Sequence, residues 1–221
     1  MKKLLIIPIL ILGSNLFAQT DSTEKAILYK KMLDKEIVQT EFSRIAMKWN
    51  ETMNEFKKYP DLPFDKSGQV HYSFLNKFMN FNKEKLFNRI LEWLTINYGI
   101  VPSYIYSNLE DGKIIFRNSL NLNTGSTCNF TTVISIKNEK ILMEYFGIAY
   151  QTFYEGHYSD DTWIPDKTIN VDINQVFPII LRKPTEWKLY LNMLKATSEI
   201  FNTETKNLYE YILSYDSSYI F

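Results

Sequence analysis

The sequence predicts an α+β protein in which packed helices cover a single antiparallel sheet of about five strands. Between residues 104 and 152, four successive segments with strand-like patterns are separated by turn signals. Segments on both sides of this region repeat apolar residues at spacings of three and four, as amphipathic helices do. The chain of 221 residues is 45% hydrophobic and 15% aromatic, which is enough to build a packed core.

The first residues of the chain predict export. Lys2 and Lys3 precede an apolar run from Leu4 to Leu12, and Ala18 offers a small residue at a cleavage point. This run is shorter than the roughly 20 residues that a membrane-spanning helix needs. No second long apolar stretch follows it. We therefore expect residues 1–18 to be a signal peptide, no transmembrane helix, and a mature protein that is periplasmic or secreted.

Residues 19–59 are expected to form an amphipathic helical segment. Its apolar stripe has spacings of three and four residues and consists of Val38, Phe42, Ile45, Trp49, Met53 and Phe56. Such a helix docks on the following domain or pairs with another chain as a coiled coil. Docking is favoured, because strict heptads are not sustained. Pro60 and Pro63 then end the helix and mark the predicted domain boundary.

Residues 60–153 are expected to form the α+β domain, which opens with a strand. Val70, Tyr72 and Phe74 alternate with polar residues, so the strand has one buried face and leaves His71 on the wetter side.

A helix is expected to follow this strand. Asn82 is its predicted N-cap, Phe81 and Leu86 are placed as a hydrophobic staple, and Gly99 is the predicted left-handed stop.

The rest of the domain is expected to be a meander of four antiparallel strands. They are predicted near 104–109, 113–122, 127–137 and 140–152. Asp111-Gly112 is a strong hairpin signal between the first two strands.

The end of the chain is expected to contain an aromatic loop and a helix. Residues 154–183 lose the strand pattern and predict a loop, apart from an apolar piece at 176–181. Residues 184–221 predict a helix and a tail, with Pro184 in the first turn and the helix ending near Ser214. The apolar side of that helix is formed by Trp187, Tyr190, Leu194, Phe201, Leu208 and Ile212.

The order of strand, helix and four-strand meander resembles that of a known protein family. The residues that carry it are 62–70, 86–94, Asp111 to Ile114, and 132–136. In these residues the chain resembles the domain-of-unknown-function family numbered 4468, over roughly residues 60–153. The resemblance implies a TATA-binding-protein-like fold and an exported protein of Gram-negative bacteria, and it brings no catalytic residues. The last hairpin turn departs from the family, because it lacks the glycine often found there.

Charge and cysteine content exclude several classes of function. The chain has 25 basic and 25 acidic side chains, and loss of Lys2 and Lys3 leaves 23 against 25, a net charge of −2. Since a nucleic-acid-binding protein normally has a basic excess or stripe, we expect no nucleic-acid partner. Cys128 is the only cysteine, which excludes an intramolecular disulfide and a cysteine metal cluster. We expect it to be buried, and we expect no metal or cofactor.

The candidate ligand-binding residues lie near the predicted loop. They are Tyr150, Tyr154, His157, Tyr158 and Trp163. Their rings, with the nearby carboxylates, suit a stacking platform for sugars or a groove for a partner peptide. The alternative is that these aromatic residues pack on the sheet and the loop caps it.

The sequence thus predicts an exported noncatalytic binding or interaction module of the bacterial cell envelope. Its partner is expected to be an envelope protein or a glycan, and no catalytic residues are predicted. The alternative is a hydrolase of envelope material or polysaccharide that uses the acids of the 155–166 loop, Glu155, Asp160 and Asp161. The ligand and the oligomeric state stay open.

Overall fold

A computed structural model describes residues 21–99, 105–122, 125–159 and 162–214. The predicted signal peptide, the C-terminal tail, Asp160 and Asp161 lie outside the described residues. The helices are α1 (Asp21–Leu33), α2 (Gln39–Phe56), α3 (Lys83–Tyr98), α4 (Ile173–Val176), η2 (Ile179–Leu181), η3 (Pro184–Glu186) and α5 (Trp187–Ser214). The strands are β1 (Tyr72–Lys77), β2 (Ile105–Asn108), β3 (Lys113–Leu122), β4 (Ser126–Lys137), β5 (Lys140–Tyr154), β6 (His157–Ser159), β7 (Thr162–Ile164) and β8 (Lys167–Asp172).

One antiparallel sheet organises the molecule, in the order β1-β5-β4-β3-β2, and β8 pairs with the second half of β5. The predicted fold class is therefore confirmed, including the meander of four strands. A bulge lies in β5 at Gly147, which has φ +58°, and it separates the part of β5 that pairs with β1 from the part that pairs with β8. In the β4–β5 turn, Glu139 adopts the left-handed conformation at φ +60°, in place of a glycine.

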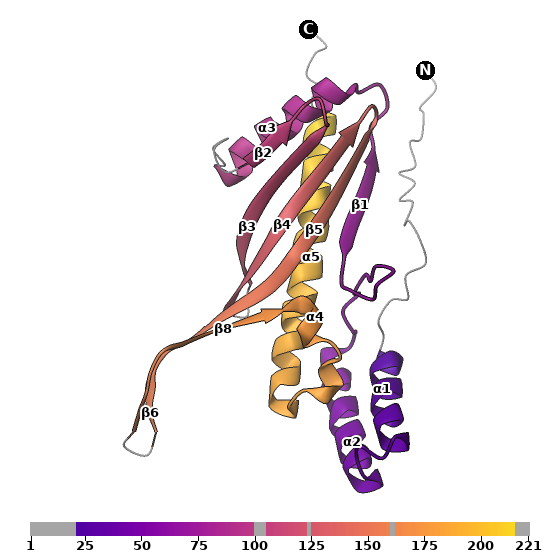
Figure 1. The fold of residues 1–221 in the computed structure, drawn as a ribbon, viewed down its shortest axis with the longest axis vertical. Coiled ribbons are helices and arrows are strands. Elements are labelled where there is room, and N and C mark those ends of the chain that lie inside the picture. The colour runs from indigo at the N-terminus through magenta and orange to yellow at the C-terminus, as the bar shows by residue number, and fades with distance from the viewer. Residues whose placement is uncertain (1–20, 100–104, 123–124, 160–161, 215–221) are drawn as a thin grey trace.

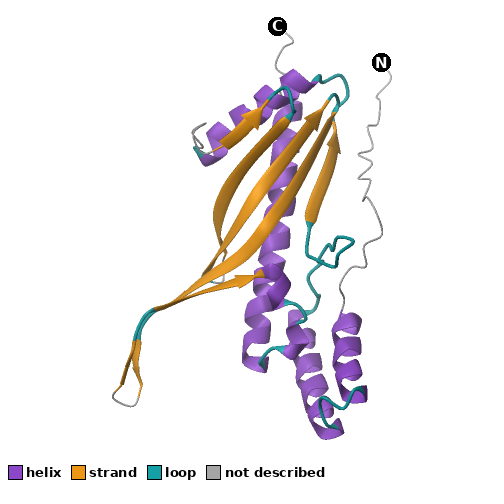
Figure 2. Ribbon diagram, in the orientation of Figure 1, coloured by secondary structure: helices purple, strands orange, loops and turns teal. Residues whose placement is uncertain are grey.

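The sheet has one covered face and one open face. Helices α3 and α5 lie on the same side of it (Figure 1, Figure 2). The period of two along each strand puts apolar side chains under these helices. They include Ile114, Phe116, Phe130, Ile134, Ile141, Met143 and Tyr145. Cys128 is buried in the same row of β4, as the alternation predicts.

Helix α3 forms where its capping residues predict. The Asn82 side chain accepts a hydrogen bond from the Lys85 N–H at 2.8 Å, and Gly99 ends the helix at φ +58°. The C-terminal helix is confirmed as well, since α5 ends at Ser214. Within the described part of the chain, no helix has the length and apolar character needed to cross a membrane.

The N-terminal segment differs from the single helix that the sequence predicts. It consists of α1 and α2, and the chain reverses near Lys35, which has φ +62°. The reversal places α1 against α2, so that Leu28 and Trp49 are both buried. The Trp49 ring meets the Trp187 ring edge-on at 5.1 Å, so the segment docks on the start of α5.

A buried carboxylate fastens α1 to the C-terminal half of the chain. Glu24 is 0% exposed, and its Oε1 accepts the Tyr59 hydroxyl at 2.6 Å and the Ile179 N–H at 3.0 Å. Its Oε2 accepts the Ile180 N–H at 3.1 Å. Burial, opposed by these hydrogen bonds, raises the pKa of Glu24 above its ordinary value of 4.5.

The prediction of a loop at 154–183 is wrong for much of that segment. Strand β8 pairs with β5 from Ala149↔Asp172 to Tyr154↔Lys167, and β6 and β7 form a further hairpin. Residues 167–172 carry only a weak strand pattern of their own. Their pairing partner is the edge of β5 beyond the bulge, which the local sequence does not reveal.

Candidate binding surface

The most prominent feature outside the core is a two-stranded arm, which we define as residues 153–168. Here β5 and β8 leave the sheet, with Phe153 paired to Thr168, and the ribbon continues into the β6–β7 hairpin. Figure 1 shows the arm projecting away from the sheet and all the helices. A two-stranded ribbon alone is marginally stable in water, so the arm has much to gain from a binding partner.

The base of the arm exposes two large aromatic side chains. Phe153 is 58% exposed and Tyr154 is 45% exposed. Glu155 is exposed as well, whereas Asp166 accepts a hydrogen bond from the Gly156 N–H at 2.7 Å and so holds the bend of the ribbon. In sequence the arm contains four acids and one lysine, a net charge of −3. It is therefore an aromatic and acidic element.

Four of the five candidate ligand-binding residues belong to the arm. They are Tyr154, His157, Tyr158 and Trp163. The backbone pairs Tyr158 with Trp163 across the ribbon. The side chains of 157–164 lie outside the described part of the structure, so a joint ligand-binding role for these residues stays a prediction.

Tyr150, the fifth candidate, lies in the core. It is 1% exposed, and its hydroxyl is 2.9 Å from Oγ1 of Thr197 on α5. Tyr150 and Tyr154 fall on the same side of β5, but Tyr150 is buried against α5, whereas Tyr154 is 45% exposed. The structure thus separates two residues that the sequence groups together, and Tyr150 offers no surface to a ligand.

The acids expected for a hydrolase lie on the arm as well. A general acid in a glycosidase needs an apolar pocket that raises its pKa, and Glu155 is exposed. Among the described residues, no group of three or more His, Cys, Asp or Glu side chains is arranged to hold a metal ion. Nothing in this geometry favours the hydrolase.

The second surface is the open face of the sheet. We define it as the outward side chains of β1 and of the parts of β3, β4 and β5 on the side of the Gly147 bulge away from the arm, namely Ser73, Leu75, Lys77, Lys113, Ile115, Arg117, Thr131, Val133, Ser135, Lys137, Lys140, Leu142, Glu144 and Phe146. Leu75 is 46% exposed and Phe146 is 42% exposed. The open face therefore offers apolar area that no element of the described chain covers.

His71 borders the open face, where the alternation of the first strand predicts it. Its ring centroid lies 4.9 Å from that of Phe146, and its Nε2 lies 3.3 Å from Oε1 of Glu144. Protonation of His71 converts that contact into an ion pair.

Positive charge gathers on the open face, mostly at the end opposite to the arm. The register aligns Lys77 with Lys140 and Lys140 with Lys137 in one row. Lys113 and Arg117 follow on β3, opposite Ser135 and Thr131. All five cations are exposed, and none forms an ion pair with another described residue. We call Lys77, Lys113, Arg117, Lys137 and Lys140 the basic rows. Among the outward residues that define the open face, Glu144 is the one carboxylate.

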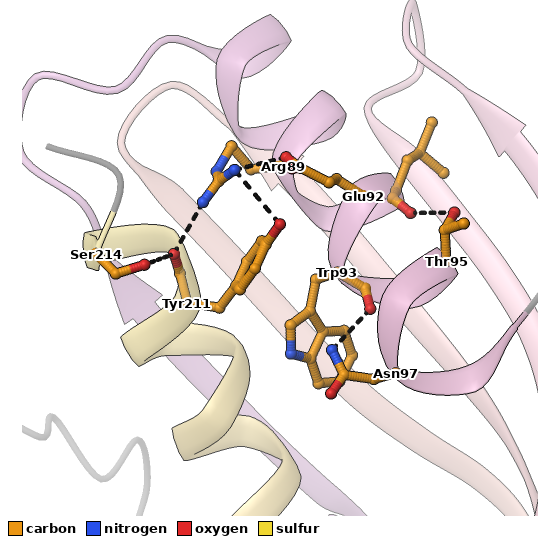
Figure 3. A network of polar contacts seen from close by, with 8 residues as sticks. Arg89, Glu92, Trp93, Thr95, Asn97, Tyr211 and Ser214 are labelled. Atoms are coloured by element: carbon orange, nitrogen blue, oxygen red, sulfur yellow. Dashed lines mark hydrogen bonds and ion pairs between the residues drawn. The ribbon is translucent and has the colours of Figure 1, made fainter. Parts of the chain in front are cut away.

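Other polar clusters serve the fold. Arg89 on α3 contacts Glu92 at 2.5 Å, donates to the Tyr211 carbonyl at 3.1 Å, and lies over the Tyr211 ring (Figure 3). It joins α3 to the last turns of α5, where a cation stabilises the free carbonyls of a helix end.

Glu204 on α5 accepts the Tyr98 hydroxyl at 2.5 Å and the Tyr145 hydroxyl at 3.4 Å. Burial raises the pKa of Glu204. Both hydroxyls donate to the same carboxylate at the helix–sheet interface, so Glu204 joins α5 to α3 and to the sheet.

Comparison with known proteins finds two solved structures that are similar to part of the chain. No family model matches the chain, and no curated protein matches it. A TBP-like protein from Parabacteroides distasonis has a similar structure, with a TM-score of 0.49 and 22% identity over 67% of this chain and 96% of that one. A DUF4468 family protein from Bacteroides ovatus is similar with a TM-score of 0.47 and 10% identity, over 68% of this chain and 90% of that one.

Proposed function

We propose that the chain is an exported, noncatalytic binding module of the bacterial cell envelope, and that the arm is its binding element. The observation that carries the proposal is the projecting ribbon with Phe153 and Tyr154 exposed at its base. Burial of each aromatic side chain against a partner contributes about 1.5–3 kcal/mol. The polar clusters around Arg89 and Glu204 hold the helices on the sheet.

The chemistry of the arm favours a protein partner. Its net charge of −3 suits a basic surface, and its aromatic residues suit an apolar one. A glycan partner needs the rings to lie parallel as a stacking platform, and the side chains that would decide this are those of the hairpin tip. We therefore propose a protein surface that combines cations with apolar side chains.

Site-specific photo-crosslinking in the bacterial envelope tests the proposal. The variant Phe153→benzoylphenylalanine carries the probe on the arm. The matched control is Met47→benzoylphenylalanine, because Met47 is 57% exposed and lies on α2, away from the arm and from the open face of the sheet. We expect a protein adduct at position 153 and none at 47. Absence of an adduct at 153, or equal adducts at both positions, contradicts the proposal.

Export is tested separately by N-terminal sequencing of the chain recovered from the periplasm or the medium. We expect the mature chain to begin at Gln19, after cleavage following Ala18. Recovery of the chain in the cytosol with Met1 still present contradicts the envelope assignment.

A further inference from the structure

We propose that the arm of one copy binds the open face of a second copy, so that two chains associate by a reciprocal exchange of arms. This inference rests on the proposed role of the arm as the binding element, and it names the partner. Three features of the molecule support it: the charges of the two surfaces, their apolar residues, and the position of the arm on its own strand.

The charges of the two surfaces are complementary. The arm has a net charge of −3. The five cations of the basic rows and the carboxylate of Glu144 give the open face a net charge of +4. Because all five cations are exposed and form no ion pair with another described residue, they are available to the carboxylates of a second chain. Complementary charge of this kind speeds association and sets the orientation of the partners.

The apolar residues match as well. Phe153 and Tyr154 are exposed at the base of the arm, and Leu75 and Phe146 are exposed on the open face. Contact between these side chains removes apolar surface from water on both chains at once. Since a twofold arrangement makes the same contact twice, each chain buries both its arm and its open face.

The position of the arm makes the contact intermolecular. Lys140 begins β5 and Tyr154 ends it, so the basic rows and the arm leave opposite ends of the same strand. At about 3.3 Å per residue, the two ends of β5 are roughly 45 Å apart. A chain cannot lay its own arm on its own basic rows without breaking the pairing of β5 with β8. A second copy in the opposite orientation places each arm beside the basic rows of the other chain.

Analytical ultracentrifugation of the mature chain with charge variants tests the inference. The arm variant is Glu155→Lys with Thr168→Lys, which brings the net charge of the arm from −3 to 0 and uses two exposed positions. The face variant is Lys137→Glu with Lys140→Glu. The control, Lys48→Glu with Lys66→Glu, makes the same change in net charge as the face variant, at exposed positions outside both surfaces.

We expect the unmodified chain and the control to dimerise with equal affinity, and each test variant to raise the dimer Kd tenfold or more. An equimolar mixture of arm and face variants contains pairs in which an intact arm meets an intact face. Such pairs should form more tightly than either variant pairs with itself. This complementation is specific to an arm-on-face contact, because loss of folding cannot produce it.

Three results overturn the inference: an unmodified chain that stays monomeric at 100 µM, test variants that match the control, or a mixture that restores no dimer. The crosslink at position 153 distinguishes the two proposals. An adduct with the mass of two copies of this chain supports the arm exchange. An adduct with a different protein, together with a monomeric chain, overturns the exchange and leaves the arm as the binding element.

Discussion

Removal of the Glu24 carboxylate should unfold the N-terminal helices from the rest of the chain more readily than any surface change. The side chain is fully buried and accepts three hydrogen bonds, from the Tyr59 hydroxyl and from the N–H groups of Ile179 and Ile180. Glu24→Ala leaves three buried donors unpaired. Since each costs about 1–3 kcal/mol, we expect a loss of roughly 3–9 kcal/mol in the free energy of unfolding.

Two milder variants separate the contributions to that loss. Glu24→Gln keeps one carbonyl oxygen for two of the donors but turns an amide N–H₂ toward the third, so we expect a loss of about 1–3 kcal/mol. Tyr59→Phe removes one donor and leaves the carboxylate with two partners, so we expect about 1 kcal/mol. Urea denaturation followed by tryptophan fluorescence measures all three variants, because Trp49 lies at the same interface.

The raised pKa of Glu24 also predicts how the effect depends on pH. Because burial disfavours the charged form, the protonated Glu24 side chain stabilises the folded chain relative to the unfolded chain. This contribution is lost as the pH rises from 4.5 through the pKa that Glu24 has in the folded chain. Glu24→Gln does not titrate. The difference in unfolding free energy between the natural chain and Glu24→Gln should therefore grow as the pH falls from 7 toward 4.5. A loss below about 1 kcal/mol for Glu24→Ala, or a difference that shrinks toward acid, would show that the Glu24 carboxylate does not hold the N-terminal helices in place.

Three further substitutions or reactions test the packing. Trp49→Ala removes a fully buried indole and its edge contact with Trp187, so urea denaturation should show a loss of about 3–5 kcal/mol; an unchanged midpoint would mean that α2 does not dock as described. Gly112→Ala places a Cβ 2.2 Å from the Ile136 carbonyl oxygen at φ +62°, and we expect a lower thermal midpoint, whereas a wild-type midpoint would contradict the tight turn. Cys128 is buried, and burial raises its pKa to about 12, so a thiol reagent at pH 8 should label it only after unfolding; rapid labelling of the folded chain would show that the strand is accessible.

Local sequence is enough to predict the features that depend on neighbouring residues. The ends of α3 follow from Asn82 and Gly99, because an N-cap side chain and a left-handed glycine act within one helical turn. The β2–β3 hairpin follows from Asp111-Gly112 for the same reason. The burial of Cys128 follows from its place in an alternating strand. In each case the interaction that decides the structure spans only a few residues.

Features that depend on partners distant in sequence emerge only from the folded arrangement of the strands and helices. Residues 167–172 form a strand because β5 offers them an edge. Tyr150 is buried against α5, whereas Tyr154 is exposed because the end of β5 diverges from the sheet and the helices into the arm. The basic rows were not visible in a sequence whose lysines are scattered among glutamates. Lys77 lies 60 residues before Lys137, and antiparallel pairing brings both to one row of the sheet. Charge and burial at a surface are sums over neighbours in space, and strand pairing, not chain order, sets those neighbours.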